Sequence, residues 1–180
     1  QLSMVGQPST AQSMKDDNIL EVNSLAKNVS LHQFMASAFI FFIIWINVDM
    51  VYALIPNVDV YVDVKFVVFI LALVKIVNTS FNVGATVLSY SKYYYYSLVF
   101  TVILTATAIF MNIKFIPIWG MEGAAMASLL SYIVYYMFLL TFVRLRIKVT
   151  PFSLNELYTL VIIVSLFVID WLLRKYISDY

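Results

Sequence analysis

The chain has 180 residues, of which 63% are hydrophobic and 12% are charged, and its formal net charge is +1. Soluble domains average about 45–50% apolar and about 25% charged residues, so this composition excludes a soluble domain and predicts an integral membrane protein. The near-neutral charge, without a basic face, gives no sign of nucleic-acid binding. The absence of cysteine excludes disulfide frameworks and thiolate metal sites.

Residues 1–30 form the one extended polar segment. Within it Ile19, Val22, Ala26 and Val29 fall near helical spacing, with charged residues between them. This pattern predicts either an amphipathic helix on the cytoplasmic membrane surface or a solvated connecting helix. The chain begins at Gln1 without a signal-peptide pattern, and we expect it to be a piece of a longer protein.

Residues 31–180 are expected to form a bundle of transmembrane helices. A bilayer core about 30 Å thick needs roughly 20 apolar residues in a helix. Five segments qualify, at about 31–54, 63–89, 97–116, 121–143 and 154–173. The joints carry turn-forming residues, among them Pro56, Pro117 and Gly120. The expected fold is therefore all-α, integral to the membrane and multi-pass.

Basic residues in the joints predict the orientation. Lys92 lies between the second and third spans, and Arg144, Arg146 and Lys148 follow the fourth. Alternating spans put these two joints and the N-terminal segment on one side, which the positive-inside rule makes cytoplasmic. The tyrosines at 90 and 93–96 fit an aromatic belt at that interface.

Lys75 lies about nine residues inside the second span, hence roughly 14 Å deep and near the bilayer centre. A charge at that depth costs at least about 2.5–3.5 kcal/mol, so it should face the protein interior or a water-filled cavity. It shares one helix face with four polar residues, Asn78, Thr79, Asn82 and Thr86. This polar stripe either lines a cavity, or joins helices by hydrogen bonds while Lys75 pairs with a carboxylate elsewhere.

The other polar and small residues in the spans are better explained by helix structure and helix packing than by a binding site. Thr101, Thr105 and Asn112 have helical spacing, and such side chains often donate to a carbonyl of their own helix. The fourth span begins with small residues that allow close approach of helices, namely Gly120, Ala124, Ala127, Ser128 and Ser131.

Catalytic and metal-binding signatures do not occur in the sequence. It has no paired carboxylates suited to acid–base chemistry, no phosphate-binding glycine loop, and a single histidine, His32. We therefore expect no enzyme activity, no cofactor and no metal site.

Several stretches together resemble a known family. They are "FVVFILALVKIVNTSFNVGATVLSYSKYYYYSLVF", "NIKFIPIWGMEGAAMASLLSYIVYYMFLLTFVRLRIKVTPFS" and, upstream, "IWINVDMVYALIPN". In order and spacing they look like the C-terminal half of bacterial polysaccharide flippases, which belong to the multidrug/oligosaccharidyl-lipid/polysaccharide exporter superfamily. The resemblance covers essentially the whole chain, although no single motif in it is specific.

The resemblance implies a transporter of 12–14 helices in two lobes around a central cavity, with this chain in the C-terminal lobe. The implied substrate is an undecaprenyl-pyrophosphate-linked oligosaccharide, moved across the bacterial inner membrane by alternating access. Lys75 would then be a counter-charge for pyrophosphate or part of ion coupling. The chain has Asn78 and Thr86 where acidic residues are expected in relatives, which favours substrate contact over ion coupling for the stripe.

Two alternatives stay open beside the flippase. One is a cation-coupled multidrug exporter of the same fold, for which cavity carboxylates would be expected. The other is a membrane subunit without transport activity, in which Lys75 is structural. The implied partners are the lipid-linked oligosaccharide, the bilayer and the missing N-terminal lobe, with no nucleic acid.

Overall fold

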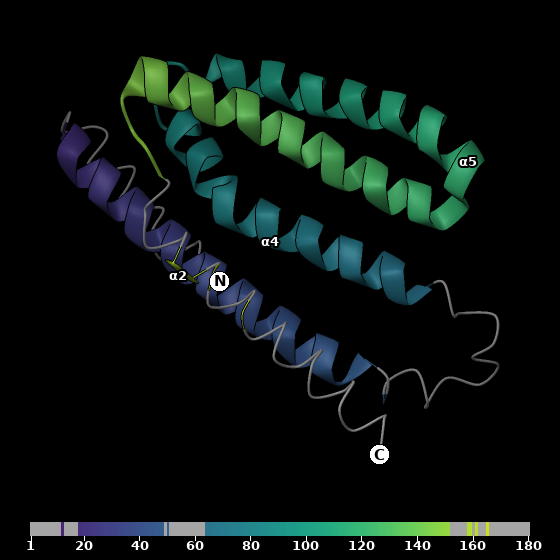
Figure 1. Ribbon diagram of the computed structural model, residues 1–180. Coiled ribbons are helices and arrows are strands. Elements are labelled where there is room, and N and C mark those ends of the chain that lie inside the picture. The colour runs from purple at the N-terminus through teal and green to yellow at the C-terminus, as the bar shows by residue number, and fades with distance from the viewer. Residues whose placement is uncertain are drawn as a thin grey trace.

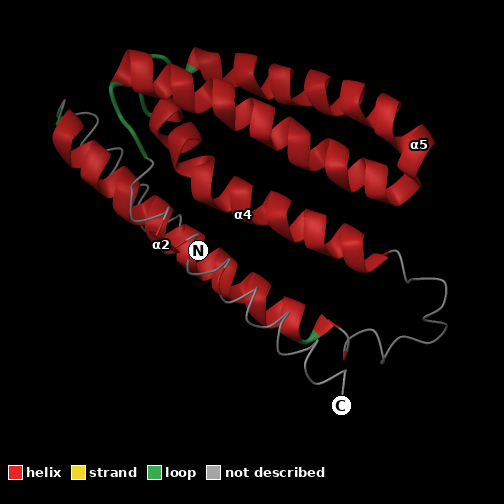
Figure 2. Cartoon of the chain, viewed as in Figure 1, coloured by secondary structure: helices red, strands yellow, loops and turns green. Residues whose placement is uncertain are grey.

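A computed structural model describes residues 18–48, 50 and 64–151, together with the isolated positions 12, 158, 159, 161 and 165. The described residues form helices joined by short turns and loops, with no β-strand among them (Figure 2). The elements are α2 (Ile19–Ile46), α4 (Val64–Ser89), α5 (Tyr95–Phe142) and a π-helical end, η2 (Val143–Ile147).

Within the described residues, three helical segments are long and apolar enough to cross a membrane: Ile19–Ile46, Lys65–Ser89 and Tyr95–Ile147. With 28 residues in α2 and 26 in α4, these helices are about 42 Å and 39 Å long. A bilayer core is about 30 Å thick. Length and composition are therefore compatible with a membrane protein.

The first helix begins earlier than the span expected at 31–54. Asn18 caps it, since its side-chain oxygen accepts from the Glu21 backbone N–H at 3.3 Å and its amide donates to the Glu21 carboxylate at 3.0 Å. The end of the polar segment and the following apolar run are thus one continuous helix. Val22 and Ala26, part of the apolar spacing in residues 1–30, are both buried.

The span expected at 63–89 corresponds to α4. The span expected at 154–173 lies outside the described residues, apart from four isolated positions.

The spans expected at 97–116 and 121–143 are the two arms of α5, which folds back on itself at Gly120 (Figure 1). Pro117 has no backbone N–H to continue the helical hydrogen bonds. Gly120 has φ 54° and ψ −124°, a conformation that suits a residue without a Cβ. At Gly123 an added Cβ would overlap the backbone carbonyl of Phe115 in the first arm. The reversal therefore depends on two glycines for different reasons.

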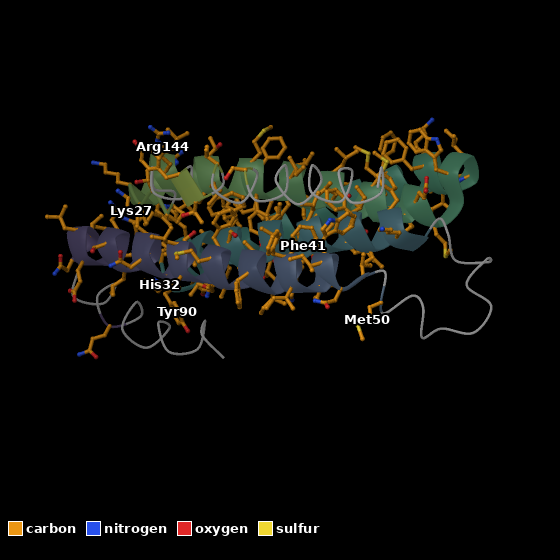
Figure 3. The ribbon with its side chains drawn as sticks, turned by 60° about the horizontal axis from the view of Figure 1, so that its bottom comes forward. Lys27, His32, Phe41, Met50, Tyr90 and Arg144 are labelled. Carbon is orange, nitrogen blue, oxygen red and sulfur yellow. The ribbon has the colours of Figure 1, made fainter. Side chains whose placement is uncertain are left out.

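Helix α4 lies between α2 and α5 and packs against both (Figure 1). Because successive segments run in opposite directions, the start of α2, the turn after α4 and the end of α5 gather at one end of the molecule. Figure 3 shows Lys27 and Arg144 at this end and Met50 at the opposite end. The Lys92 joint and the basic segment after the fourth expected span lie at the same end of the described helices, since both border one pocket.

The main buried cluster lies toward the same end. It includes Val22, Val87, Leu139 and Val143, which are essentially inaccessible to solvent. Beside it, the Phe142 ring contacts three aromatic rings, with centroid distances of 5.9 Å to Tyr93, 4.7 Å to Tyr96 and 5.5 Å to Phe100. These contacts join the end of the second arm of α5 to the start of the first.

A hydrogen bond closes this end of the bundle. The Asn23 side-chain oxygen accepts from the backbone N–H of Thr150 at 2.8 Å and from its hydroxyl at 3.3 Å. The first turns of α2 are thereby joined to the segment that follows η2.

We expect Gly123→Ala to destabilise the α5 hairpin strongly. The new methyl group meets a backbone carbonyl, which can move only if the two arms separate, so the loss should reach the upper part of the roughly 1–3 kcal/mol typical of overpacking. The measurement is the midpoint of thermal unfolding of the purified protein in detergent.

Gly84→Ala in α4 is the matched control. Its added Cβ would lie 2.7 Å from the Cδ2 of Leu140, and a leucine tip can change rotamer. The gain of about 1 kcal/mol in helix propensity offsets part of that cost. Equal losses for the two variants would contradict the close-approach explanation.

Candidate functional site

The candidate site is the face of α4 that carries Lys75. One side of the helix is buried and includes Ile70, Ser80, Val83, Val87 and Leu88. Lys75 and Asn82 lie on the opposite side and are exposed. Leu71 and Ser89 are exposed in the same line, at spacings of four and seven residues that return to one helix face. The lysine therefore lies near the middle of a long apolar helix, on the side that neither α2 nor α5 covers.

The structure divides the predicted stripe. Asn78 is turned toward the second arm of α5, where the Tyr136 hydroxyl donates to its side-chain oxygen at 2.6 Å and lies 3.2 Å from its backbone carbonyl. Thr79 and Thr86 are half-buried at the flank of the stripe. The Thr86 hydroxyl donates to the Asn82 carbonyl at 3.2 Å, within its own helix. Lys75 and Asn82 are thus the exposed part of the site. Asn78 instead contacts the second arm of α5 through Tyr136.

Lys75 has no ion-pair or hydrogen-bond partner within the described residues. The carboxylate that a structural role for this lysine requires is therefore not found in the described part of the chain. Nor do three or more His, Asp or Glu residues come together there in a way that could hold a metal ion. The imidazole Nδ1 of His32 lies 2.6 Å from the Asn28 carbonyl, so this histidine has a polar partner within its own helix.

Hydrogen bonds between helices were one of the two predicted roles of the stripe, but sequence reasoning identified neither the Ser30–Ser80 contact nor the Tyr136 partner of Asn78. The buried Ser30 hydroxyl of α2 donates to the Ser80 carbonyl of α4 at 2.8 Å. A signal was present, because Ser30 continues the buried row of Val22 and Ala26 at intervals of four residues. Tyr136 carried no comparable signal, since its partner lies 58 residues away in the chain.

The polar residues of the third expected span donate to their own helix, as predicted. Thr101 donates to the Ser97 carbonyl, and Thr105 to the Thr101 carbonyl, both at 2.9 Å. The Asn112 side-chain amide does the same to Ala108 at 2.9 Å. In the second arm Ala127 and Ser131 are buried. This confirms the prediction that these two small residues lie where helices pack closely.

Comparison with protein-family models, curated proteins and solved structures gives no match for this chain. The family resemblance therefore depends on the quoted sequence segments alone. The structure itself defines a coarser class: its described part is helical, with helices long and apolar enough to cross a membrane and a lysine on the exposed face of α4.

The Tyr136–Asn78 pair should contribute little to stability. Hydrogen bonds between membrane helices average about 0.6 kcal/mol and reach about 1.7 kcal/mol. A double-mutant cycle of Tyr136→Phe, Asn78→Ala and their combination, measured by unfolding in detergent, should give a coupling energy in that range. A coupling near zero would mean that Asn78 does not hold this contact in solution.

Proposed function

We propose that this chain belongs to the C-terminal lobe of a bacterial flippase that exports lipid-linked oligosaccharide or polysaccharide precursors. The proposed substrate carries an undecaprenyl-pyrophosphate anchor and crosses the inner membrane by alternating access, without enzymatic chemistry. The observation that carries the proposal is the exposure of Lys75 on α4. The family resemblance of the sequence supplies the substrate class.

The position of Lys75 requires a polar environment that the described helices do not provide. A charged side chain facing lipid near the bilayer centre costs at least about 2.5–3.5 kcal/mol. The other sides of α4 are already occupied by α2 and α5. In our proposal the open side faces a water-filled cavity, and the missing lobe forms the opposite wall.

The residues of this face then have distinct roles. The Lys75 ammonium is a counter-charge for the pyrophosphate, because a compact cation with three donors suits phosphate oxygens. Asn82 lies in line with it and presents an amide to the sugar hydroxyls. Thr79 and Thr86 border the same path, and Asn78 keeps amide donors for the cavity while its oxygen accepts from Tyr136. The stripe contains no carboxylate, so any coupling ion is bound elsewhere.

We expect Lys75→Ala in the intact transporter, expressed in its own host, to reduce export of surface polysaccharide by about 10- to 100-fold. This range corresponds to the loss of one charge-assisted contact of about 1.5–3 kcal/mol. Lys75→Arg should retain part of the activity, because it keeps the positive charge. Export is measured per transporter present in the membrane.

Lys114→Ala is the matched control, because it removes a lysine of the first arm of α5 that is also exposed. It should export normally. Normal export by Lys75→Ala would contradict the proposal. Loss of export only because the protein disappears from the membrane would favour a structural lysine and a subunit without this transport role.

A further inference from the structure

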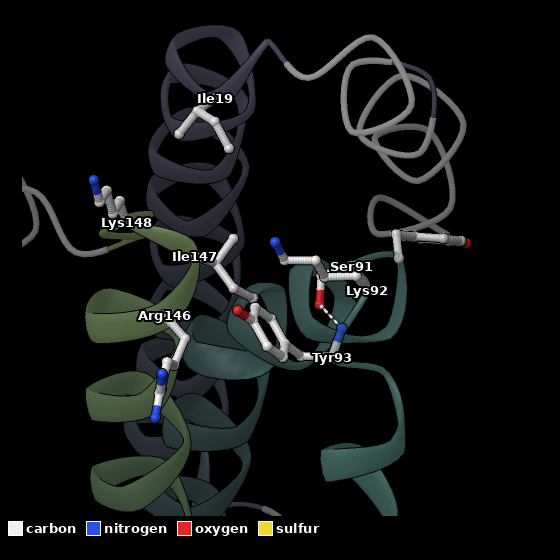
Figure 4. Close-up of a pocket in the computed structure, with 8 residues that line it drawn as sticks. Ile19, Ser91, Lys92, Tyr93, Arg146, Ile147 and Lys148 are labelled. Atoms are coloured by element: carbon white, nitrogen blue, oxygen red, sulfur yellow. Dashed lines mark hydrogen bonds between the residues drawn. The ribbon is translucent and has the colours of Figure 1, made fainter.

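A second polar feature lies at the end of the bundle where α2 begins. A pocket of about 390 Å³ opens between the start of α2, the turn from α4 to α5 and the end of α5 (Figure 4). This is at the small end of the roughly 300–1,000 Å³ typical of small-molecule sites. Three basic residues line it: Lys92 from the turn, Arg146 from η2 and Lys148 directly after η2. We call it the basic pocket.

No described residue compensates the charge of the basic pocket. None of its described lining residues is acidic, and Lys92, Arg146 and Lys148 form no ion pair within the described part of the chain. The Lys92 ammonium lies 5.4 Å from the centre of the Tyr93 ring, a contact that holds the cation without neutralising it. Figure 4 shows the Lys92 ammonium directed into the pocket and the charged ends of Arg146 and Lys148 directed outward from its other wall. Three exposed basic residues thus line the pocket, and their combined positive charge favours an anion.

The walls of the pocket are held in place by the backbone. In the turn, the Ser91 hydroxyl donates to the Leu88 carbonyl at 2.8 Å and accepts from the Tyr93 N–H at 3.1 Å. On the other side the π-helical η2 ends at Lys148, which has φ 63°. The nearby hydrogen bonds between Asn23 and Thr150 fix that segment to α2. The pocket therefore exists before any ligand binds.

The surroundings are those of a membrane interface. Tyr90 borders the pocket, and Tyr94, Tyr95 and Tyr96 are exposed beside it, as in the aromatic belts where rings meet lipid headgroups. A side-chain hydrogen bond with Tyr95 raises the pKa of Tyr94.

Apolar side chains adjoin the same end. Leu145 in η2 and Leu98 in the first turn of α5 are about 70% exposed, at 72% and 70% respectively. A ligand held here therefore meets cations at one end and apolar surface next to them. An amphiphile with an anionic head matches that arrangement better than a small soluble anion does.

We infer that the basic pocket binds the phosphate headgroup of an anionic membrane phospholipid, with its acyl chains lying against the apolar surface next to η2. Basic pockets between membrane helices on the cytoplasmic side commonly bind such headgroups, at about 1 kcal/mol per Lys or Arg near the surface. The inference requires that the chain lies in a membrane. It does not depend on the substrate or on transport.

The test measures lipid retention by native mass spectrometry of the intact protein in detergent. Phosphatidylglycerol and phosphatidylcholine with the same acyl chains are added in parallel. The pocket variant combines Lys92→Gln, Arg146→Gln and Lys148→Asn, where asparagine suits the positive φ of that position. We expect the wild type to prefer phosphatidylglycerol, and each single substitution to weaken that preference about fivefold.

A charge-matched variant with Lys27→Gln, Lys114→Gln and Arg144→Gln removes three cations that do not line the pocket. It should keep the preference for phosphatidylglycerol, as should Lys75→Ala. The inference would be overturned if the pocket variant and the charge-matched variant lost the preference for phosphatidylglycerol equally, or if neither lost it. A double variant with Lys92→Arg and Arg146→Lys keeps both positive charges. If it keeps the preference for phosphatidylglycerol, the inference is supported even if the triple variant is unstable.

A comparison with inorganic phosphate distinguishes a lipid headgroup from a free phosphate ion as the ligand of the basic pocket. The midpoint of thermal unfolding of the wild type is compared with inorganic phosphate or with phosphatidylglycerol at the same concentration. Stabilisation by the lipid alone is the expected result. Equal stabilisation by inorganic phosphate would show a site for free anions and overturn the assignment to a lipid.

Discussion

The structure depends on the need of an apolar chain to satisfy its polar groups without water. In a bilayer each unpaired backbone group costs several kcal/mol, which leaves helices as the way for such a chain to cross. Many side chains follow the same rule and donate to a carbonyl of their own helix, among them Ser37, Ser80, Ser89, Thr101, Thr105, Ser128, Ser131 and Thr141. Polar groups that reach another helix are therefore few in the described residues, and these few specify how the helices fit together.

Those contacts divide the bundle into a fixed end and an open face. The fixed end combines the Asn23–Thr150 hydrogen bonds with the aromatic contacts of Phe142. The Tyr136–Asn78 and Ser30–Ser80 contacts hold α4 against α5 and α2. On the remaining side of α4, Lys75 and Asn82 have no such neighbours among the described residues. This exposed lysine on a packed helix is the feature on which the proposed cavity wall depends.

Periodicity and turn chemistry predicted much of this fold. The apolar run at 63–89 gave α4 almost to the residue, and Pro117 with Gly120 located the reversal of α5. The start of α2 could not be predicted in the same way, because a helix crosses from a polar to an apolar stretch without a break in hydrogen bonding. Helical spacing did not foresee that the structure divides the stripe, with Lys75 and Asn82 exposed and Asn78 turned toward Tyr136. Whether Asn78 points to a cavity or to Tyr136 depends on a tertiary contact, which helical spacing does not encode.

The two basic features of the chain are physically separate, although both are connected to α4. Lys75 is 14 residues before the end of this helix at Ser89, which places it about 21 Å along the axis from the turn that carries Lys92. The Debye length at physiological ionic strength is about 8 Å. Charges in the turn therefore have little influence on an anion near Lys75 through solvent, and the reverse also holds. A pyrophosphate in the cavity and a headgroup in the basic pocket would bind independently, unless a movement of α4 changes both sites together.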